Sequence, residues 1–366
     1  MAFFAHFSLP LDSYPFALSR LLVWVIFPAG VLKLDFRVSE VIPLDSPLSM
    51  YIEPTRTCNF KCFYCMHSTR GEKGGILDRT GFRLAHMDME LFDKLAGEIM
   101  AFPTPVKRVC FSGLGDPLMN PRLPEMVRKL RQAGFTGRID AISNGALLTH
   151  DFSDALIDAG LNRLQISIQG LTQQQYLENC GVAVDVEKLM AELDYFHQRA
   201  QGTETSLFVK IIDIMLKNEK DKELFFEMFS GLCDTIFVEH LVIMEQQMGD
   251  HGGRADHSRN LNGEYVEKRM VCGVMFYFLQ VNIDGETFPC STPGLPNSFS
   301  MGCAKDHTLQ EIWTGQVRHR LMCRNLKDGY ATIPACSECS SCIAIADDTE
   351  YLDDCREEML ARITGQ

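Results

Sequence analysis

The chain has 366 residues, of which 46% are hydrophobic, and this content can fill one large domain and a smaller one. Its net charge of −13 argues against a nucleic-acid substrate, because nucleic-acid binding draws on clustered Lys and Arg. The sequence has no signal peptide with a basic start, an apolar middle and a small-residue cleavage site. We therefore expect a reducing, cytoplasmic compartment, in which the 14 cysteines serve as metal ligands or buried thiols.

Residues 1–47 are predicted to form an N-terminal extension. Its apolar stretch, residues 21–32, is interrupted by Pro28 and is shorter than the roughly 20 residues that a bilayer core requires. We therefore expect a packed amphipathic extension rather than a membrane-surface anchor.

From Leu48 onward, short β-branched and apolar runs alternate with longer runs of helical period, as in βα units around a parallel sheet. The predicted strands are residues 48–54, 106–113, 137–143, 161–168, 206–216 and 235–243. The predicted helices are residues 89–102, 123–134, 150–160, 186–200 and 223–232, two of which end at Gly134 and Gly160. This order predicts an α/β fold, a partial (β/α)6 TIM-like barrel over residues 48–245, with ligands at the carboxyl ends of the strands.

The barrel pattern stops in a polar, glycine-rich stretch. Residues 246–271 are predicted to be a linker or an active-site loop, because the sequence around them has no clear period. Residues 272–366 are predicted to form a small α+β domain. It begins with a hairpin signal over residues 276–290, in which Asp284 and Gly285 supply the turn, and a helix is predicted over residues 309–322.

Three cysteines, Cys58, Cys62 and Cys65, follow the first predicted barrel strand at intervals of four and three residues. Three thiolates on one loop can hold three corners of a cubane iron–sulfur cluster and leave the fourth iron without a protein ligand. A zinc site normally closes with four ligands. Neither zinc nor chance spacing accounts for the position of the triplet at the end of a barrel strand, where this architecture places its chemistry.

These cysteines, with Tyr64 directly before the last, resemble the signature of the radical S-adenosylmethionine (radical SAM) superfamily. The resemblance implies a [4Fe-4S] cluster whose open iron is chelated by S-adenosylmethionine. It implies that reduction yields a 5′-deoxyadenosyl radical, which abstracts hydrogen from a substrate. It also implies an electron donor such as flavodoxin or ferredoxin.

The segment FSGLGDP, residues 111–117, is similar to the Gly-Gly-Glu segment of this family, which binds the methionyl amine. Leu114, Gly115 and Asp116 take the corresponding places, with Leu for the first Gly and Asp for Glu. A tight turn between a strand and a helix is an alternative explanation for these glycines.

The segments ISNG and SIQG, which follow the next two strands, resemble the positions of the family that contact the methionyl carboxylate and the ribose. The resemblance implies these roles for Ser143, Asn144 and Ser167. Ser and Asn at strand ends also cap helices, so the order of the segments along the chain is the stronger indication.

A second group of cysteines lies beyond the predicted linker: Cys272, Cys290, Cys336, Cys339 and Cys342. Residues 285–290 and 301–313 resemble the C-terminal extensions called SPASM and twitch, which implies an auxiliary [4Fe-4S] cluster. We expect one such cluster, twitch-like, on the first four of these cysteines, with Cys342 as a rival for either of the last two places. Zinc remains an alternative, because paired cysteines serve both metals.

The other cysteines are predicted to have no part in the first cluster. Cys110, Cys180 and Cys233 lie in or beside apolar runs and are expected to be small buried hydrophobes. Cys303 and Cys323 receive no assignment, and Cys355 is a further possible ligand of a second cluster.

An auxiliary cluster can accept the electron that remains after hydrogen abstraction, which favours an oxidoreductase acting on a small-molecule or sugar-like substrate. Such a reaction needs a base for the hydroxyl proton. Asp213, Glu239 and His240 lie on late strands, although a structural role is expected for each. Arg70, just after the cysteine loop, is a candidate contact for an anionic substrate.

Two other functions are considered. The first is modification of a ribosomal peptide by epimerisation, crosslinking or thioether formation. Many such enzymes carry a leader-binding winged-helix domain, for which the region before Leu48 is too short. The second is a non-catalytic iron–sulfur scaffold, which would leave the S-adenosylmethionine-like segments without a purpose.

Overall fold

The computed structural model describes residues 25–26, 32–33, 37–242, 258–337, 339, 342 and 351–365. Of the predicted extension it describes the ladder between β1 (Val25–Ile26) and β2 (Leu32–Lys33), then the part from residue 37, with α1 (Val38–Val41). Most of the predicted amphipathic stretch and much of the predicted linker lie outside the described residues. Among the helices that are described, none is long and apolar enough to cross a membrane.

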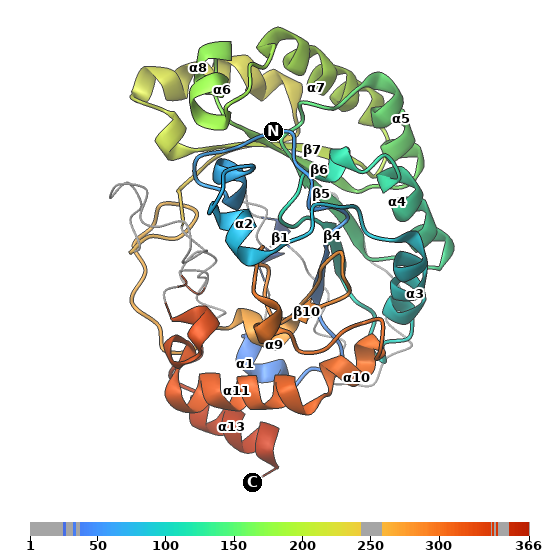
Figure 1. Cartoon of the computed structure of the whole chain (residues 1–366), viewed down its shortest axis with the longest axis vertical. Helices are drawn as coiled ribbons and strands as arrows, with labels where there is room; N and C mark the ends of the chain where they lie inside the picture. Colours follow the sequence, from blue (N-terminus) through green and yellow to red (C-terminus); the bar gives the residue numbers. More distant parts are fainter. Residues whose placement is uncertain are drawn as a thin grey trace.

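A sheet with the strand order β10-β9-β3-β4-β5-β6-β7-β8 forms the centre of the fold (Figure 1). Its parallel strands from β3 to β8 each lie within one of the predicted strands and confirm the α/β partial barrel. They are β3 (Ser49–Ile52), β4 (Arg108–Phe111), β5 (Arg138–Ser143), β6 (Arg163–Ile168), β7 (Ser206–Ile212) and β8 (Thr235–Glu239).

The helices that connect these strands lie along the outer side of the sheet (Figure 1). The predicted ones are present as α3 (Met89–Met100), α4 (Leu123–Gln132), α5 (His150–Asp158), α7 (Val186–Ala200) and α8 (Glu219–Phe229). Gly134 and Gly160 follow two of them with φ of +97° and +90°, the left-handed conformation that ends helices. The sequence did not reveal α2 (Ile76–Thr80) or α6 (Gln173–Cys180). In α6 the buried residues are Tyr176 and Cys180, too few for an apolar period.

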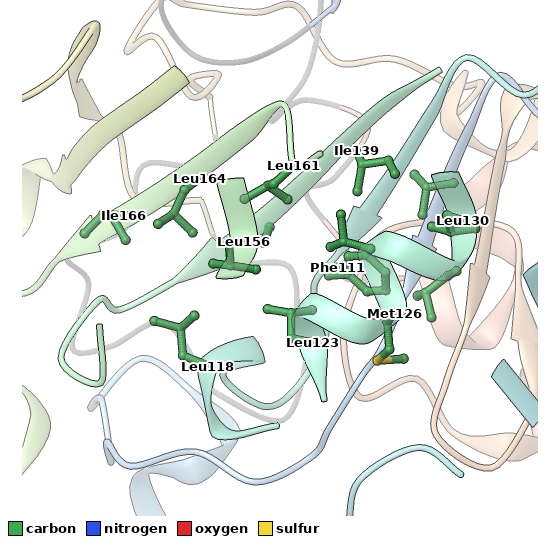
Figure 2. Packing of buried hydrophobic residues seen from close by; sticks show 14 of the residues in the cluster. Phe111, Leu118, Leu123, Met126, Leu130, Ile139, Leu156, Leu161, Leu164 and Ile166 are labelled. Atoms are coloured by element: carbon green, nitrogen blue, oxygen red, sulfur yellow. The ribbon is translucent and has the colours of Figure 1, made fainter. Parts of the chain in front are cut away.

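Alternate residues of each strand face the helices or the barrel interior. Leu164 and Ile166 of β6 lie in the apolar cluster that also contains residues of α5 and α7, and Figure 2 shows both close to Leu156 of α5. Ile166 is paired in register with Val209 of β7, which belongs to the same cluster. The residues between them, such as Ser167 and Lys210, therefore belong to the opposite face, which we call the interior face.

The region beyond the predicted linker continues the barrel sheet. Strand β9 (Phe278–Val281) pairs in parallel with β3, and β10 (Thr287–Phe288) pairs antiparallel with β9, which confirms the predicted hairpin. The predicted helix is divided into α10 (Leu309–Trp313) and α11 (Gln316–Asp328), and α9 (Val274–Tyr277) and α13 (Arg356–Thr364) complete this part. The predicted domain boundary lies at residue 272, and β9, which follows it, hydrogen-bonds to β3 of the barrel.

Glu53, directly after β3, joins three segments of the chain. Its buried carboxylate accepts hydrogen bonds from Leu114 N at 2.8 Å, Ile283 N at 3.2 Å and Arg56 Nε at 2.9 Å. Arg56 in turn donates from Nη1 to Asp284 at 2.7 Å. Burial of a carboxylate without these donors would raise the free energy of the folded state. The burial of Glu53 therefore requires these hydrogen bonds.

Glu53→Ala is expected to lower the free energy of unfolding by roughly 3–5 kcal/mol, because Arg56 Nε and the backbone N–H groups of Leu114 and Ile283 would remain buried without their acceptor. The matched control is Arg83→Ala. Arg83 reaches the same Asp284 from the surface, with 63% of its side chain exposed, and its removal should cost about 1 kcal/mol or less. Urea unfolding of both variants measures the difference, and equal losses would contradict the role of Glu53.

Candidate functional site

The loop that carries the first three cysteines is fixed on both sides. Within the loop, Cys65 N donates to Cys62 O at 3.0 Å and Phe60 N donates to Cys58 Sγ at 3.4 Å. Against the end of α6, Lys61 N donates to Cys180 O at 2.9 Å. The loop therefore has a defined conformation that places its thiols beside the carboxyl end of β3.

The thiols of Cys58, Cys62 and Cys65 are reduced and partly exposed, whereas those of Cys110 and Cys233 are buried, as predicted. Burial is the main cause that raises the pKa of Cys58 to about 12. The pKa of Cys62 lies well above its usual value, first because of a hydrogen bond with Cys180 and then because of burial. Three accessible thiols on one loop are the donor set that a cluster with an open iron requires, and iron binding would release their protons.

Gly115 lies where the loop after β4 meets the start of the cysteine loop. A Cβ atom at Gly115 would lie 2.4 Å from Thr55 O and 2.5 Å from Thr57 O, so this approach requires glycine. The next residue, Asp116, donates from its backbone N to Thr57 O at 2.9 Å. The glycine therefore serves close packing of the segment against the cysteine loop, in addition to any turn.

Asp116, Ser143 and Asn144 form one buried group. The Asp116 carboxylate accepts from Ser143 Oγ at 2.9 Å, from Asn144 N at 2.7 Å and from Leu118 N at 2.9 Å. Burial raises the pKa of Asp116, and these three hydrogen bonds oppose that shift. Asn144 Nδ2 donates to Asn59 Oδ1 at 2.7 Å, so the group extends to the cysteine loop.

Tyr64 reaches the end of β6 through a residue that the sequence analysis did not select. Its hydroxyl donates to Gln169 Oε1 at 2.8 Å, and Gln169 Nε2 donates to Ser167 O at 3.2 Å. Asn179 of α6 holds the Gln169 carbonyl at 2.6 Å. Gln169 is part of the SIQG segment, which is the signal that could have identified it.

The register distinguishes the three candidate bases. Glu239 is paired with Ile212, two residues after Lys210, and therefore lies on the interior face, where Lys210 Nζ forms an ion pair with it. Asp213 begins a short 3-10 helix (Asp213–Met215) directly after β7, and His240 directly follows β8, so the alternation of the strands does not extend to either residue. They contact each other, with Asp213 Oδ2 2.6 Å from His240 Nδ1. Each candidate thus has a charged or polar partner, as expected for structural residues.

At the other end of the interior face, Asp140 of β5 binds Arg108 Nε at 2.6 Å and Arg138 Nη2 at 2.9 Å. This ion-pair group lies towards the amino ends of the strands, where barrel residues support stability. The pair of Lys210 and Glu239 lies towards the carboxyl ends, where barrels bind ligands. The side chain of Lys210 is 16% exposed and that of Glu239 is 9% exposed.

Arg70 is turned towards the cysteine loop. Its Nη1 donates to the carbonyl of Cys58 and lies 3.2 Å from His67 Nδ1. In this arrangement it stabilises the loop.

The second group of cysteines lies in and beside one apolar cluster. Cys272, Cys336 and Cys342 are buried in it, and Cys290 packs against it. Burial is the main cause that raises the pKa of Cys272 well above its usual value, and the four other thiols of the group add to the shift. The structure therefore brings together all five predicted cysteines: Cys272, Cys290, Cys336, Cys339 and Cys342.

No set of three His, Cys, Asp or Glu within the described part of the chain converges on a single metal-ion position. A cluster spreads its ligands over several irons, so five neighbouring thiols suit it without such convergence. Cys355 lies apart, with its Sγ 3.8 Å from Met359 Sδ. Cys303 contacts the Asp284 carbonyl, and Cys323 contacts His319.

Two buried amides, which the sequence analysis did not select, hold the backbone of these cysteines. Asn325 of α11 accepts from Cys272 N at 3.0 Å and donates to Cys272 O at 2.9 Å. With its amide oriented to donate, Gln280 of β9 lies 2.8 Å from Cys290 O. Side-chain amides on a helix and a strand have no signature in sequence, because their partners are distant along the chain.

Comparisons with known sequences agree with both cysteine groups. Residues 52–226 match the Radical SAM superfamily, and residues 272–342 match SPASM, an iron-sulfur cluster-binding domain. A tungsten-containing aldehyde ferredoxin oxidoreductase cofactor-modifying protein of Pyrococcus furiosus is 24% identical over 80% of this chain and 86% of its own length. A probable GTP 3′,8-cyclase of Methanothermobacter marburgensis is 32% identical over 40% of this chain and 46% of its own length. The chain thus covers less than half of that second relative.

Solved structures share the fold at low sequence identity. SuiB of Streptococcus suis bound to S-adenosylmethionine has a TM-score of 0.57 and 13% identity, covering 87% of this chain and 79% of its own. The enzyme anSMEcpe with bound AdoMet has a TM-score of 0.54 and 14% identity, covering 87% and 100%. BtrN in complex with AdoMet and 2-DOIA has a TM-score of 0.50 and 17% identity, covering 83% and 97%. From the two matched regions and this shared fold we conclude that the chain belongs to the radical SAM superfamily and carries a SPASM iron–sulfur cluster-binding domain.

Proposed function

We propose that this enzyme oxidises a small polar substrate at a carbon that bears a hydroxyl group. The observation that carries the proposal is the second group of thiols, which gathers in a region whose strand β9 pairs with β3, the strand that precedes the first cysteines. Membership of the superfamily implies S-adenosylmethionine and a [4Fe-4S] cluster as cofactors, and the SPASM domain implies auxiliary iron–sulfur binding. When bound, these cofactors supply a 5′-deoxyadenosyl radical and an electron acceptor.

The two metal sites are assigned to the two cysteine groups. Cys58, Cys62 and Cys65 would hold the first cluster. The second would be held by four of the five thiols around the apolar cluster, with Cys342 as well placed by burial as Cys336. The second group would take the electron that the substrate loses.

Five side chains and one glycine are assigned to S-adenosylmethionine. Asp116 would hold the methionyl ammonium, since a carboxylate can accept a further donor beside its three present ones. Ser143 and Asn144 would contact the methionyl carboxylate. The remaining contacts would come from Gly115, Tyr64 and Ser167.

The proton of the substrate hydroxyl would be taken by Glu239. Its carboxylate lies on the interior face at the carboxyl end of β8, and the Lys210 ammonium beside it can stabilise negative charge that develops on the substrate oxygen. The substrate then loses one hydrogen atom, one proton and one electron, and its C–OH becomes C=O. Asp213 and His240 are less suited, because they lie beyond the ends of their strands and contact each other.

A small substrate is favoured over a peptide by two kinds of observation. The interior face carries hydrogen-bonding groups from adjacent strands, namely Lys210 and Glu239, as a polyol or sugar-like molecule requires. The names of two relatives also refer to small molecules, GTP in one and a cofactor in the other. Modification of a ribosomal peptide is the alternative, and the substrate panel below distinguishes the two.

Asp116→Ala is expected to weaken S-adenosylmethionine binding about tenfold or more, because a hydrogen bond to a charged group contributes roughly 1.5–3 kcal/mol. Iron content should remain near that of the wild type. Ser143→Ala removes one of the donors to the same carboxylate and should have a smaller effect. Calorimetric titration of anaerobically reconstituted protein measures the affinities. Wild-type affinity in Asp116→Ala would show that this segment is only a turn.

Asn325→Ala is expected to lower the iron content to about four per chain, from about eight for two [4Fe-4S] clusters. The reason is that Cys272 would lose both hydrogen bonds that fix its backbone. Asn162→Ala is the matched control, since Asn162, directly before β6, accepts at Oδ1 from Ile139 N at 2.8 Å, far in sequence from the second group of cysteines. A full complement of iron in folded Asn325→Ala would contradict this role.

Glu239→Gln is expected to lower the rate of substrate oxidation about 100-fold or more, the usual effect of removing a general base. Formation of 5′-deoxyadenosine should continue, uncoupled from product. The reconstituted enzyme is incubated with a panel of polyols, sugars and short peptides, and mass spectrometry detects product that has lost two hydrogens. Asp213→Asn is the control and should retain oxidation. Product from peptides alone, without net oxidation, would support the alternative function.

A further inference from the structure

Cys62 and Cys180 place their sulfur atoms 3.6 Å apart, although they are distant in sequence. Cys62 lies in the cysteine loop, and Cys180 is the last residue of α6. The two segments are held together by backbone hydrogen bonds, from Lys61 N to Cys180 O at 2.9 Å and from Phe63 N to Asn179 O at 3.0 Å. These bonds hold the two backbone segments side by side, with the sulfur atoms at contact distance.

The two thiols differ in their access to solvent. Cys62 is partly exposed, whereas Cys180 is fully buried against the core. Of the two residues, Cys62 has the surface that solvent can reach, so a peroxide meets Cys62 before Cys180, whose sulfur lies 3.6 Å from that of Cys62. An accessible thiol with a second thiol in reach is the arrangement in which one cysteine reacts and the other resolves the product.

We propose that Cys62 and Cys180 form a disulfide when the first cluster has been lost. Hydrogen peroxide or a related peroxide oxidises the Cys62 thiol to a sulfenic acid and is reduced to water. The Cys180 sulfur then attacks the Cys62 sulfur, the S–S bond forms, and the sulfenic hydroxyl leaves with the thiol proton as a second water. The disulfide protects Cys62 from irreversible oxidation and prevents cluster assembly until a thiol reductant restores both thiols.

Iron bound at Cys62 blocks this step, because the thiolate is then a metal ligand. The disulfide is therefore expected in protein that has lost its cluster and not in intact protein. The inference concerns the fate of the loop and does not depend on the substrate or on the oxidation reaction.

The test uses the full-length protein, reconstituted with iron and sulfide and then exposed to hydrogen peroxide. Peptide mapping by mass spectrometry is expected to find Cys62 joined to Cys180, with loss of both free thiols. After reduction and renewed reconstitution, the wild type should regain its iron. Cys180→Ala should bind iron normally at first and fail to regain it, because Cys62 would be oxidised to the sulfinic acid.

Cys233→Ala is the matched control, since Cys233 is also buried and its Sγ contacts Phe229 O at 3.3 Å, away from the cysteine loop. It should recover its iron as the wild type does. Circular dichroism confirms that the variants remain folded. A disulfide within the loop, from Cys62 to Cys58 or Cys65, would overturn the proposal. So would a free Cys180 thiol beside an overoxidised Cys62, or full recovery of iron by Cys180→Ala.

Discussion

The buried carboxylate of Glu53 is the contact on which the arrangement of the site depends. It accepts hydrogen bonds from the segment after β4, from the turn after β9 and from Arg56 at the start of the cysteine loop. A charge buried in this way is tolerated only with several donors, and here the donors come from three parts of the chain. The hydrogen bonds of this one carboxylate thus hold the cysteine loop, the S-adenosylmethionine-like segment and the C-terminal strand in fixed positions relative to one another.

Further contacts bring these segments of the site together. Gly115 allows the segment after β4 to touch the backbone of Thr55 and Thr57, and Asn144 reaches the cysteine loop from the next strand. On the other side of β3, β9 pairs with β10, which leads into Cys290, whose carbonyl lies beside Gln280. The loop with the first cysteines and Cys290 of the second group therefore adjoin strands of one sheet.

The interior face carries two ion-pair groups at different positions along the strands. Asp140 and its arginines lie towards the amino ends, and Lys210 and Glu239 lie towards the carboxyl ends. Both groups pair a buried carboxylate with partly exposed basic side chains. They differ in position along the strands, and ligands of this barrel architecture bind at the carboxyl ends.

Patterns among residues close in sequence determined much of the secondary structure and both cysteine groups of this protein. The strands, most of the connecting helices, the hairpin and both cysteine groups follow from periodicity, turn residues and spacing, which act between residues close in sequence. The tertiary structure alone decided that β9 extends the barrel, that Gln169, Gln280 and Asn325 hold the site, and that Cys180 lies behind Cys62. Each of these contacts joins residues far apart along the chain. Their energies come from burial and pairing that exist only after folding, so the sequence does not record the contacts themselves, although the SIQG segment could have drawn attention to Gln169.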